Sequence, residues 1–373
     1  MGIDIIDARM RGQAGEELID DAEISLIRTF SSFTINRLLA ENTGGTIEYT
    51  INGGFSFWQY GTSQATSGYG SDDRWRNSNA GTTKAHSRQE FDAGQKDVPG
   101  NPRFYSRTAV SSVAGAGNFC NKAQRIEDVR RSSGKTMTLS FWARADAEKE
   151  MAAEFRQNFG TGGSAAVNGI GARKVSLSAG WQKYSVTVTF PSIGGKIVGE
   201  NSWFSAEFWF DAGSDFGSRT GGLGHQSGTF DLAQVSLADG VSAVPFVPRL
   251  PGVELVLCQW YYEKSYSLEV APGTNSNANF WQGIAHTLNS MDGPKFKVEK
   301  RARPTVTIFS IRGTRDAVSV STGTNANIAG LNARVLHVAT GGVGIIANNV
   351  APSTTSFTVG GLFLYHWTAD AEL

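Results

Sequence analysis

The chain has 373 residues, enough for two or three domains that each bury a core of their own. It has 44 glycines, and 18% of its residues are charged and 11% aromatic, a balance typical of turn-rich all-β proteins. Lys plus Arg equals Asp plus Glu at 34 each, so no net charge draws in nucleic acid or an anionic membrane. We therefore expect neither a nucleic-acid partner nor membrane insertion.

Cysteine spacing and the first residues exclude several other classes. Cys120 and Cys258 lie far apart and lack the paired spacing of a zinc or disulfide framework. Asp4, Asp7 and Arg9 interrupt any apolar signal core, and no stretch approaches the roughly 18 apolar residues of a spanning helix. We expect a soluble chain made in a cytoplasm.

Residues 1–45 differ from the rest of the chain. Asp21 can cap a helix in which apolar and small residues recur at three- and four-residue steps from Ile24 to Leu38. The apolar stripe is thin and half polar, so it is too weak to form a core. The pattern predicts a helical segment that attaches to a partner and ends within 42–45.

From Thr46 the apolar period changes to two. Ile47, Tyr49 and Ile51 alternate, and the turn at 52–54 followed by Phe55 predicts a β-hairpin. Because the connections between later alternating segments are long and rich in Gly and Ser, we expect a sandwich over 46–248. These segments are marked by Met137, Leu139, Phe141 and Ala143; by Tyr184, Val186, Val188 and Phe190; and by Phe204, Ala206, Phe208 and Phe210.

A domain boundary is predicted at Val244 to Pro251, where three prolines remove backbone donors and stop strand pairing. Residues 254–262 are expected to form one short helix. Alternation then resumes at Val306 to Ser310, Val335 to Ala339 and Leu362 to His366. The region 252–373 is therefore predicted to be a second, smaller β domain.

Several motifs occur in a characteristic order along the chain. The first is Asn52-Gly53-Gly54-Phe55-Ser56-Phe57-Trp58-Gln59-Tyr60-Gly61-Thr62-Ser63, followed by Asp73-Arg74-Trp75. The later motifs are Gln124 to Glu127, Leu139 to Arg144, Arg156 to Gly160, Trp181 to Tyr184, Phe230 to Val235, Leu257 to Lys264 and Thr368 to Leu373. In this order they resemble the tail-fibre proteins of bacteriophages and prophages that carry a jelly roll of carbohydrate-binding-module type.

The resemblance implies a fold and a function. The fold is an all-β jelly-roll sandwich with a short N-terminal helical attachment segment and a smaller C-terminal β domain. The function is that of a virion tail fibre or tail-tip subunit, assembled in the host cytoplasm, which recognises a bacterial surface glycan. Residues 1–45 would bind other tail or baseplate proteins, and the fibre would be a homotrimer.

Two other functional classes remain open. A purely structural virion decoration, or a head or neck fibre without receptor binding, would use the same jelly roll. A capsule depolymerase is the third class, but the regular short rungs of a long β-helix are not present in the sequence.

The sequence predicts no enzyme and no catalytic residue. Glycoside cleavage needs two carboxylates about 5–10 Å apart across a cleft. The candidate acids are Asp72 with Asp73, Glu207, and Asp211 with Asp215. Asp73 is interpreted instead as a partner of Arg74 or a turn residue, and Asp211 and Asp215 lie in a Gly-rich loop. The five histidines lack metal-ligand spacing.

Glycan binding needs an aromatic plane for the sugar's C–H face and polar groups at its rim. On β-alternation, Trp203 and Trp209 point away from the core if Phe204 and Phe208 fill it, and Glu207 shares their face. Trp142 and Trp181 lie in strand motifs and are expected in the core. The predicted glycan-binding residues are Trp58, Tyr60, Trp75, Arg76, Trp203, Glu207 and Trp209.

Two further sites are predicted. Jelly rolls of this type often hold a structural calcium, and Asp231 matches one ligand of that pattern while Ser56 stands where the other acid would be. Asp231 is therefore a weak calcium candidate, and no other cofactor is expected. The strand at 362–367 is apolar on both faces, which predicts Tyr365 and Trp367 at a subunit contact.

Overall fold

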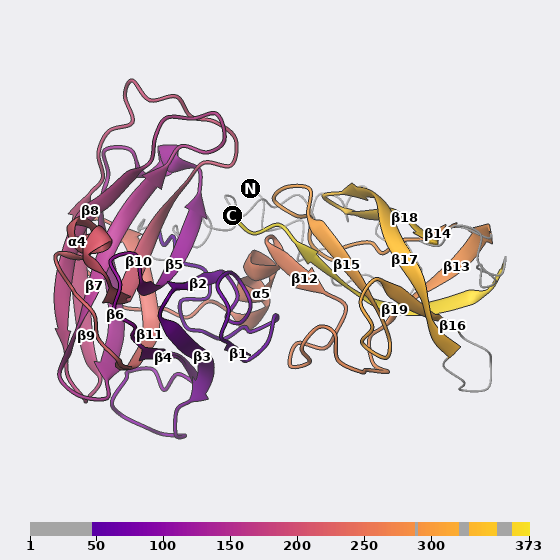
Figure 1. Cartoon of the computed structure of the whole chain (residues 1–373), viewed down its shortest axis with the longest axis horizontal. Helices are drawn as coiled ribbons and strands as arrows, with labels where there is room; N and C mark the ends of the chain where they lie inside the picture. Colours follow the sequence, from indigo (N-terminus) through magenta and orange to yellow (C-terminus); the bar gives the residue numbers. More distant parts are fainter. Residues whose placement is uncertain (1–46, 288–289, 321–327, 349–359) are drawn as a thin grey trace, which may run out of the picture.

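The computed structural model describes residues 47–287, 290–320, 328–348 and 360–373 (Figure 1). The predicted attachment segment, 1–45, lies outside the described residues. No helix in the part of the chain that the structure describes is long and apolar enough to cross a membrane.

The first domain is a jelly-roll sandwich of two antiparallel sheets (Figure 1). One sheet has six strands in the order β1-β3-β4-β11-β6-β9, and the other has five in the order β2-β5-β10-β7-β8. The strands are β1 (Ser63–Gln64), β2 (Trp75–Ala80), β3 (Thr83–Glu90), β4 (Phe104–Ser111), β5 (Phe119–Glu127), β6 (Thr136–Ala145), β7 (Lys149–Asn158), β8 (Val167–Leu177), β9 (Gln182–Thr189), β10 (Trp203–Ala212) and β11 (Gly228–Asp239).

The core of the sandwich follows the period of two. Phe204, Phe208 and Phe210 on β10 face inward, and Phe141 on β6 meets Phe208 edge to face with ring centroids 5.0 Å apart. All four are fully buried. Each contributes about 1.5–3 kcal/mol by leaving water. The strand predictions at 137–143, 184–190 and 204–210 are confirmed.

The predicted hairpin at 47–57 is wrong. This segment lies along β11 with irregular hydrogen bonds, in which the Tyr49 amide donates to the Leu237 carbonyl at 2.8 Å and the Val235 amide donates to Gly53 at 2.9 Å. The Asn52 side chain holds the turn by accepting from the Phe57 amide at 3.0 Å. Asn52 and Phe55 both have positive φ, which breaks the alternation that a hairpin needs.

Helices are few and short among the described residues. They are η1 (Val129–Ser132), η2 (Ser214–Phe216), α4 (Gly217–Thr220) and α5 (Pro251–Gln259). Pro251 stands in the first turn of α5, where its missing amide hydrogen costs nothing. The short helix predicted after the prolines is confirmed, shifted toward the N-terminus.

The C-terminal domain is built around β19 (Leu362–Asp370). Pairings β19–β13–β14–β18–β17–β16 return to β19 and close a ring of six strands, and β12 and β15 also pair with β19. The other strands are β12 (Tyr262–Lys264), β13 (Trp281–Thr287), β14 (Ser290–Asp292), β15 (Thr305–Ser310), β16 (Ala317–Val320), β17 (Ile328–Ala339) and β18 (Gly342–Asn348).

The closed ring explains why β19 is apolar on both faces. Phe363, Tyr365 and Trp367 fill the core of this domain, and Tyr365 and Trp367 are 0% and 2% exposed. On the other face, His366 stacks on Tyr266 with ring centroids 3.8 Å apart. The prediction that Tyr365 and Trp367 form a subunit contact is therefore wrong, because the chain's own strands and loops cover both faces.

The two domains meet over a small shared core. Helix α5 supplies Leu257 and Cys258, which pack with Tyr261 against Ile51 of the jelly roll. Arg74 lies over the Tyr261 ring with 3.3 Å between its Cζ and the ring centroid, and its guanidinium bonds Glu372. Because the Arg74 and Glu372 side chains are 1% and 4% exposed, this ion pair joins the domains away from bulk water.

Candidate functional site: the cleft between the domains

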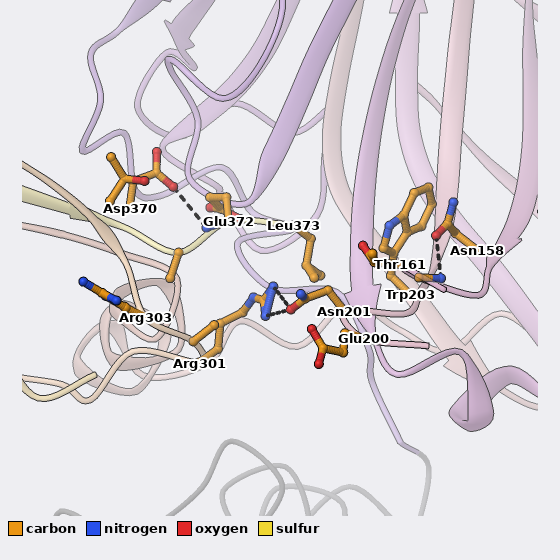
Figure 2. Close-up of a pocket in the computed structure, with 14 residues that line it drawn as sticks. Asn158, Thr161, Glu200, Asn201, Trp203, Arg301, Arg303, Asp370, Glu372 and Leu373 are labelled. Atoms are coloured by element: carbon orange, nitrogen blue, oxygen red, sulfur yellow. Dashed lines mark hydrogen bonds between the residues drawn. The ribbon is translucent and has the colours of Figure 1, made fainter. Parts of the chain in front are cut away.

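The cleft between the domains holds two cavities of about 590 and 640 Å³. Thr305, Asp370, Glu372 and Leu373 line both, so the end of β19 and the residues after it form a shared wall. The jelly roll supplies the facing wall of the first cavity, with Asn158, Thr161 and Trp203 in Figure 2. Both volumes are in the range of small-ligand sites.

Two residues that line the first cavity carry a buried polar atom without a partner among the described residues. Arg301 donates from both terminal nitrogens to the Asn201 Oδ1 at 3.1 Å, which crosses the cleft (Figure 2). The Arg301 Nε and the Glu372 Oε1 are buried, and neither has a hydrogen-bond partner among the described residues. Because an unpaired buried polar group costs about 1–3 kcal/mol, these atoms favour a bound water or a ligand hydroxyl.

The ring of Trp203 is covered on the cleft floor. The Cζ atoms of Arg125 and Arg156 lie 4.3 and 5.2 Å from its centroid, and the residue is 7% exposed. The two guanidiniums therefore occupy the positions in which a sugar would stack.

The second cavity is richer in aromatic rings. Tyr60 stacks on Tyr262 with centroids 3.6 Å apart, and its hydroxyl donates to the Asp370 Oδ2 at 3.2 Å. Burial raises the pKa of Asp370 to about 6. Arg76 and Phe309 complete this part of the lining. Aromatic edges and charged rim groups thus face the same space.

The structure brings three of the predicted glycan residues, Tyr60, Arg76 and Trp203, to the cleft. It places Trp58 and Trp75 in the jelly-roll core, where they are 4% and 1% exposed. Both indoles donate to backbone carbonyls of the irregular 52–57 segment, at 2.6 and 3.1 Å. The prediction for these two was wrong because both rings belong to the core cluster of the jelly roll.

Trp209 lies on the outer face of its sheet, as predicted, but it is not available to a ligand. Phe119, Phe216 and the Arg219 guanidinium cover it, and it is 1% exposed. Its indole donates to the Glu154 Oε1 at 3.1 Å. The segment that contains η2 and α4 folds over the sheet at this point, which strand alternation cannot reveal.

Glu207 belongs to a carboxylate pair that the sequence analysis missed. It stands directly opposite Glu154 across β10 and β7, and Arg219 bonds both carboxylates. Burial raises the pKa of Glu154 to about 7. The alternation of Met151, Ala153 and Phe155 in the core could have placed Glu154 on this face. The two carboxyl side chains are 0% and 2% exposed, so they are covered on the outer face of the sheet and solvent does not reach them.

The other acids considered as catalytic candidates have partners. Asp72 bonds Lys122 and accepts from the His86 Nε2 at 3.0 Å, and all three side chains are inaccessible. Burial alone would raise the pKa of Asp72, but these neighbours hold it well below its usual value. Asp73 accepts from the Gln59 amide at 2.7 Å, and Asp211 accepts from Thr82 and Ser112 at 2.6 and 2.8 Å. Asp215 is exposed.

Asp231 is held by two arginines. Arg107 donates to both carboxylate oxygens at 2.7 and 2.8 Å, and the Arg144 Nε donates at 2.9 Å. The hydrogen bonds that Arg107 donates to Asp231 raise the pKa of Arg107. Two guanidiniums so close oppose a cation at this carboxylate, and no group of three His, Cys, Asp or Glu side chains in the described ranges could hold a metal. Calcium binding stays a prediction.

Trp142 and Trp181 were expected in the core, and the structure places both outside it. Phe141 and Ala143 point inward on β6, so Trp142 points outward, and it is partly exposed. Trp181 packs on Phe91 and Tyr105 outside the sandwich. Strand alternation was the better guide at Trp142 than the family motif.

The comparisons with known proteins concern the fold. A scan against protein-family models finds no match, and a search of curated proteins finds none. The chain is similar to a solved carbohydrate-binding module, CBM4, at 18% identity over 51% of this chain and 100% of the module, with a TM-score of 0.31. A cyclase from Fischerella sp. TAU is 11% identical over 53% of this chain and 100% of the cyclase, with a TM-score of 0.34.

A bacteriophage structure is also among the similar proteins. The enzymatically active domain of tailspike protein 4 from bacteriophage CBA120 is 11% identical over 52% of this chain and 21% of that chain, with a TM-score of 0.30. Each of these likenesses is one of fold, and none assigns a ligand to the cleft.

Proposed function

We propose that this protein binds a bacterial surface glycan in the cleft between its domains, as a tail-fibre or tail-tip subunit of a bacteriophage virion. The observation that carries the binding proposal is the cleft itself. It combines the buried, unpaired Arg301 Nε and Glu372 Oε1 with the aromatic edges of Tyr60 and Phe309. Sugars present both hydroxyls and apolar C–H faces, which this lining matches.

The proposal divides the work between the two cavities. Hydroxyl groups of the glycan bond the unpaired Arg301 and Glu372 atoms in the first cavity and displace water. In the second cavity, ring edges of Tyr60 and Phe309 contact C–H groups while Arg76 bonds ring substituents.

We further propose that the chain binds without cleaving. Glu154 and Glu207 stand directly opposite each other on neighbouring strands, and Arg219 bonds both carboxylates, which are buried. A general acid must reach the glycosidic oxygen within hydrogen-bonding distance. A purified chain should therefore release no oligosaccharide from host capsule or lipopolysaccharide, and release that is lost in Glu154→Gln would overturn this.

The virion role rests on the order of the sequence motifs, and the homotrimer on the weak affinity of single glycan sites. Several copies on one fibre convert millimolar binding into firm attachment. Light scattering should give three times the monomer mass, and antibody labelling of virions should mark the tail. Labelling of the head or neck would favour the structural alternative.

The cleft is tested with variants of two residues that line it, and far-ultraviolet circular dichroism checks that each variant is folded. Tyr60→Ala and Arg76→Gln should each weaken binding to host lipopolysaccharide at least about fivefold in calorimetry. Lys174→Gln is the matched control, since Lys174 pairs with Glu150 at the surface, 37% exposed, and does not line the cleft. If the cleft variants bind like wild type, the site is elsewhere.

A further inference from the structure

A third cavity, of about 420 Å³, opens on the outer face of the six-stranded sheet and shares no lining residue with the cleft. Its floor is Trp142 on β6 and Lys183 on β9, which are paired directly across the strands. The connection between the domains forms one wall through Phe246, and Asn101 and Arg103 form another.

Trp142 is partly exposed and lines this cavity. It makes no ring stacking, cation–π contact or hydrogen bond with any residue that the structure describes, whereas Trp181 on the same face packs on two rings and an arginine. A partly exposed indole that lines a cavity and has no ring or hydrogen-bond partner there is suited to contact a ligand. This is the arrangement that Trp203 lacks.

A strained backbone turns a polar side chain toward the same cavity. The register of β11 against β6 shifts between Ala233 and Ser236, and Gln234 in this bulge has a φ of 46°. Its amide nitrogen donates to the Pro99 carbonyl at 2.6 Å, which fixes the side chain among the lining residues. Bulges of this kind re-aim side chains at binding sites, at a cost of about 1–3 kcal/mol.

The charge of the cavity has one sign. Arg103 and Lys183 are the charged residues that line it, and no carboxylate does. Arg103 lies over the Phe104 ring, with 4.5 Å between its Cζ and the ring centroid, and its ion-pair partner Glu90 is 3.6 Å away in a pair whose side chains are 74% and 58% exposed. Such a surface pair contributes little, so the cavity presents two cations to a ligand.

We infer that this cavity is a second binding site, and that its ligand is a pyranose carrying a carboxylate, a uronic acid residue of a polysaccharide. The sugar's C–H face lies on Trp142, its carboxylate faces Lys183 and Arg103, and its hydroxyls meet Gln234 and Asn101. The volume suits one or two sugar rings. The site does not depend on glycan binding in the cleft.

Indole N–H signals in two-dimensional NMR of the full chain test this directly. Trp142→Phe assigns the Trp142 signal among the nine tryptophans. Sodium glucuronate at up to tens of millimolar should move the Trp142 signal in a saturable way, and glucose should need at least about fivefold higher concentration. Added salt should weaken the glucuronate response, because the attraction is electrostatic.

Variants separate the stacking from the charge. Binding to Trp142→Ala is measured by calorimetry, because this variant lacks the indole signal, and it should be about tenfold weaker than in the wild type. Lys183→Gln should abolish the preference over glucose, and Trp181→Phe, on the same face but outside the cavity, should bind normally. A Trp142 signal unmoved by glucuronate overturns the proposal, and an equal response to both sugars overturns its charged ligand. Cleft variants such as Tyr60→Ala should leave the Trp142 response intact, so failure of one site is distinguishable from failure of the other.

Discussion

The two outer faces of the jelly roll carry similar residues and put them to different use. On the five-stranded sheet, Trp203 and Trp209 point outward, and arginines or aromatic rings cover both. On the six-stranded sheet, Trp142 points outward and floors an open cavity. The comparison teaches that an indole on the outer face of a sheet is not thereby available to a ligand. Its availability depends on which side chains pack over its ring.

Arginines lie over the tryptophans of the five-stranded face for an energetic reason. Glu154 and Glu207 stand side by side there, and each needs a cation because a buried carboxylate is costly. Arg219 bonds both acids and Arg156 bonds Glu207, and the same guanidiniums lie over the indoles. On the six-stranded face, Asp231 occupies Arg107 and Arg144 away from the Trp142 cavity, so the indole stays open.

The largest expected difference between the faces is in stability. Trp209→Ala should lower the free energy of unfolding by about 3–5 kcal/mol, because it removes a fully buried ring from between Phe119 and Phe216. Trp142→Ala should cost less, about 1–2 kcal/mol, since the indole is partly exposed and has no ring or cation partner among the described residues. Urea denaturation of the two variants checks this. Equal losses would make Trp142 a structural residue and remove the contrast.

How far the sequence predicts these faces is clear from particular residues. The period of two correctly put Trp203, Glu207 and Trp209 on one face of β10, because alternation depends only on the backbone. It did not predict Arg219 above Trp209, because that contact is made by a Gly-rich loop that returns from beyond the strand. Tyr365 and Trp367 were misplaced for a similar reason, since closure of a ring of strands leaves no pattern within one strand.

The cleft was only partly predictable. The sequence predicted Tyr60 and Arg76 from their residue types near a motif. They reach the cleft because the C-terminal domain packs there. That packing depends on contacts between residues more than 200 positions apart, such as Tyr60 with Tyr262. Arg301 and Glu372 were not predicted, because nothing local marks their unpaired atoms.

The second expected effect concerns the cation that the acids share. Arg219→Ala should lower the free energy of unfolding by about 2 kcal/mol at pH 8, because it leaves Glu154 and Glu207 facing each other without their shared partner. The loss should be smaller at pH 5. Arg107→Ala on the other face should cost less, about 1 kcal/mol, because Arg144 still bonds Asp231.

The sign of this pH dependence follows from Glu154. Its pKa is raised from 4.5 to about 7 in the folded chain, so the folded state binds more protons than the unfolded state between those values. Stability from this group is therefore present at low pH and falls as the pH rises through about 4.5 to 7. Removing Arg219 should steepen that fall. Thermal unfolding of the variant at pH 5 and pH 8 measures it, and a pH-independent loss would mean that Glu154 does not titrate in this range.

The smallest expected effect is that of Arg156→Gln. It tests whether an uncovered tryptophan ring is enough for sugar binding, or whether the walls of a cavity are needed as well. Arg156 lies 5.2 Å from the Trp203 centroid, and it donates to Asn168 at 2.7 Å and to Glu207 at 3.2 Å. Because Arg219 still bonds Glu207 in the variant, Arg156→Gln should cost only about 1 kcal/mol of stability. The substitution uncovers one face of Trp203.

If cover alone distinguishes the two faces, the Trp203 indole signal of Arg156→Gln should broaden with a soluble nitroxide and should begin to shift with glucose. Trp142 in the same sample serves as the internal reference, since it is partly exposed and lines a cavity in the wild type. A Trp203 signal that becomes accessible to the nitroxide yet ignores sugar would show that an open ring is not sufficient. The walls that Phe246, Gln234 and Asn101 build around Trp142 would then be what makes one face a binding site.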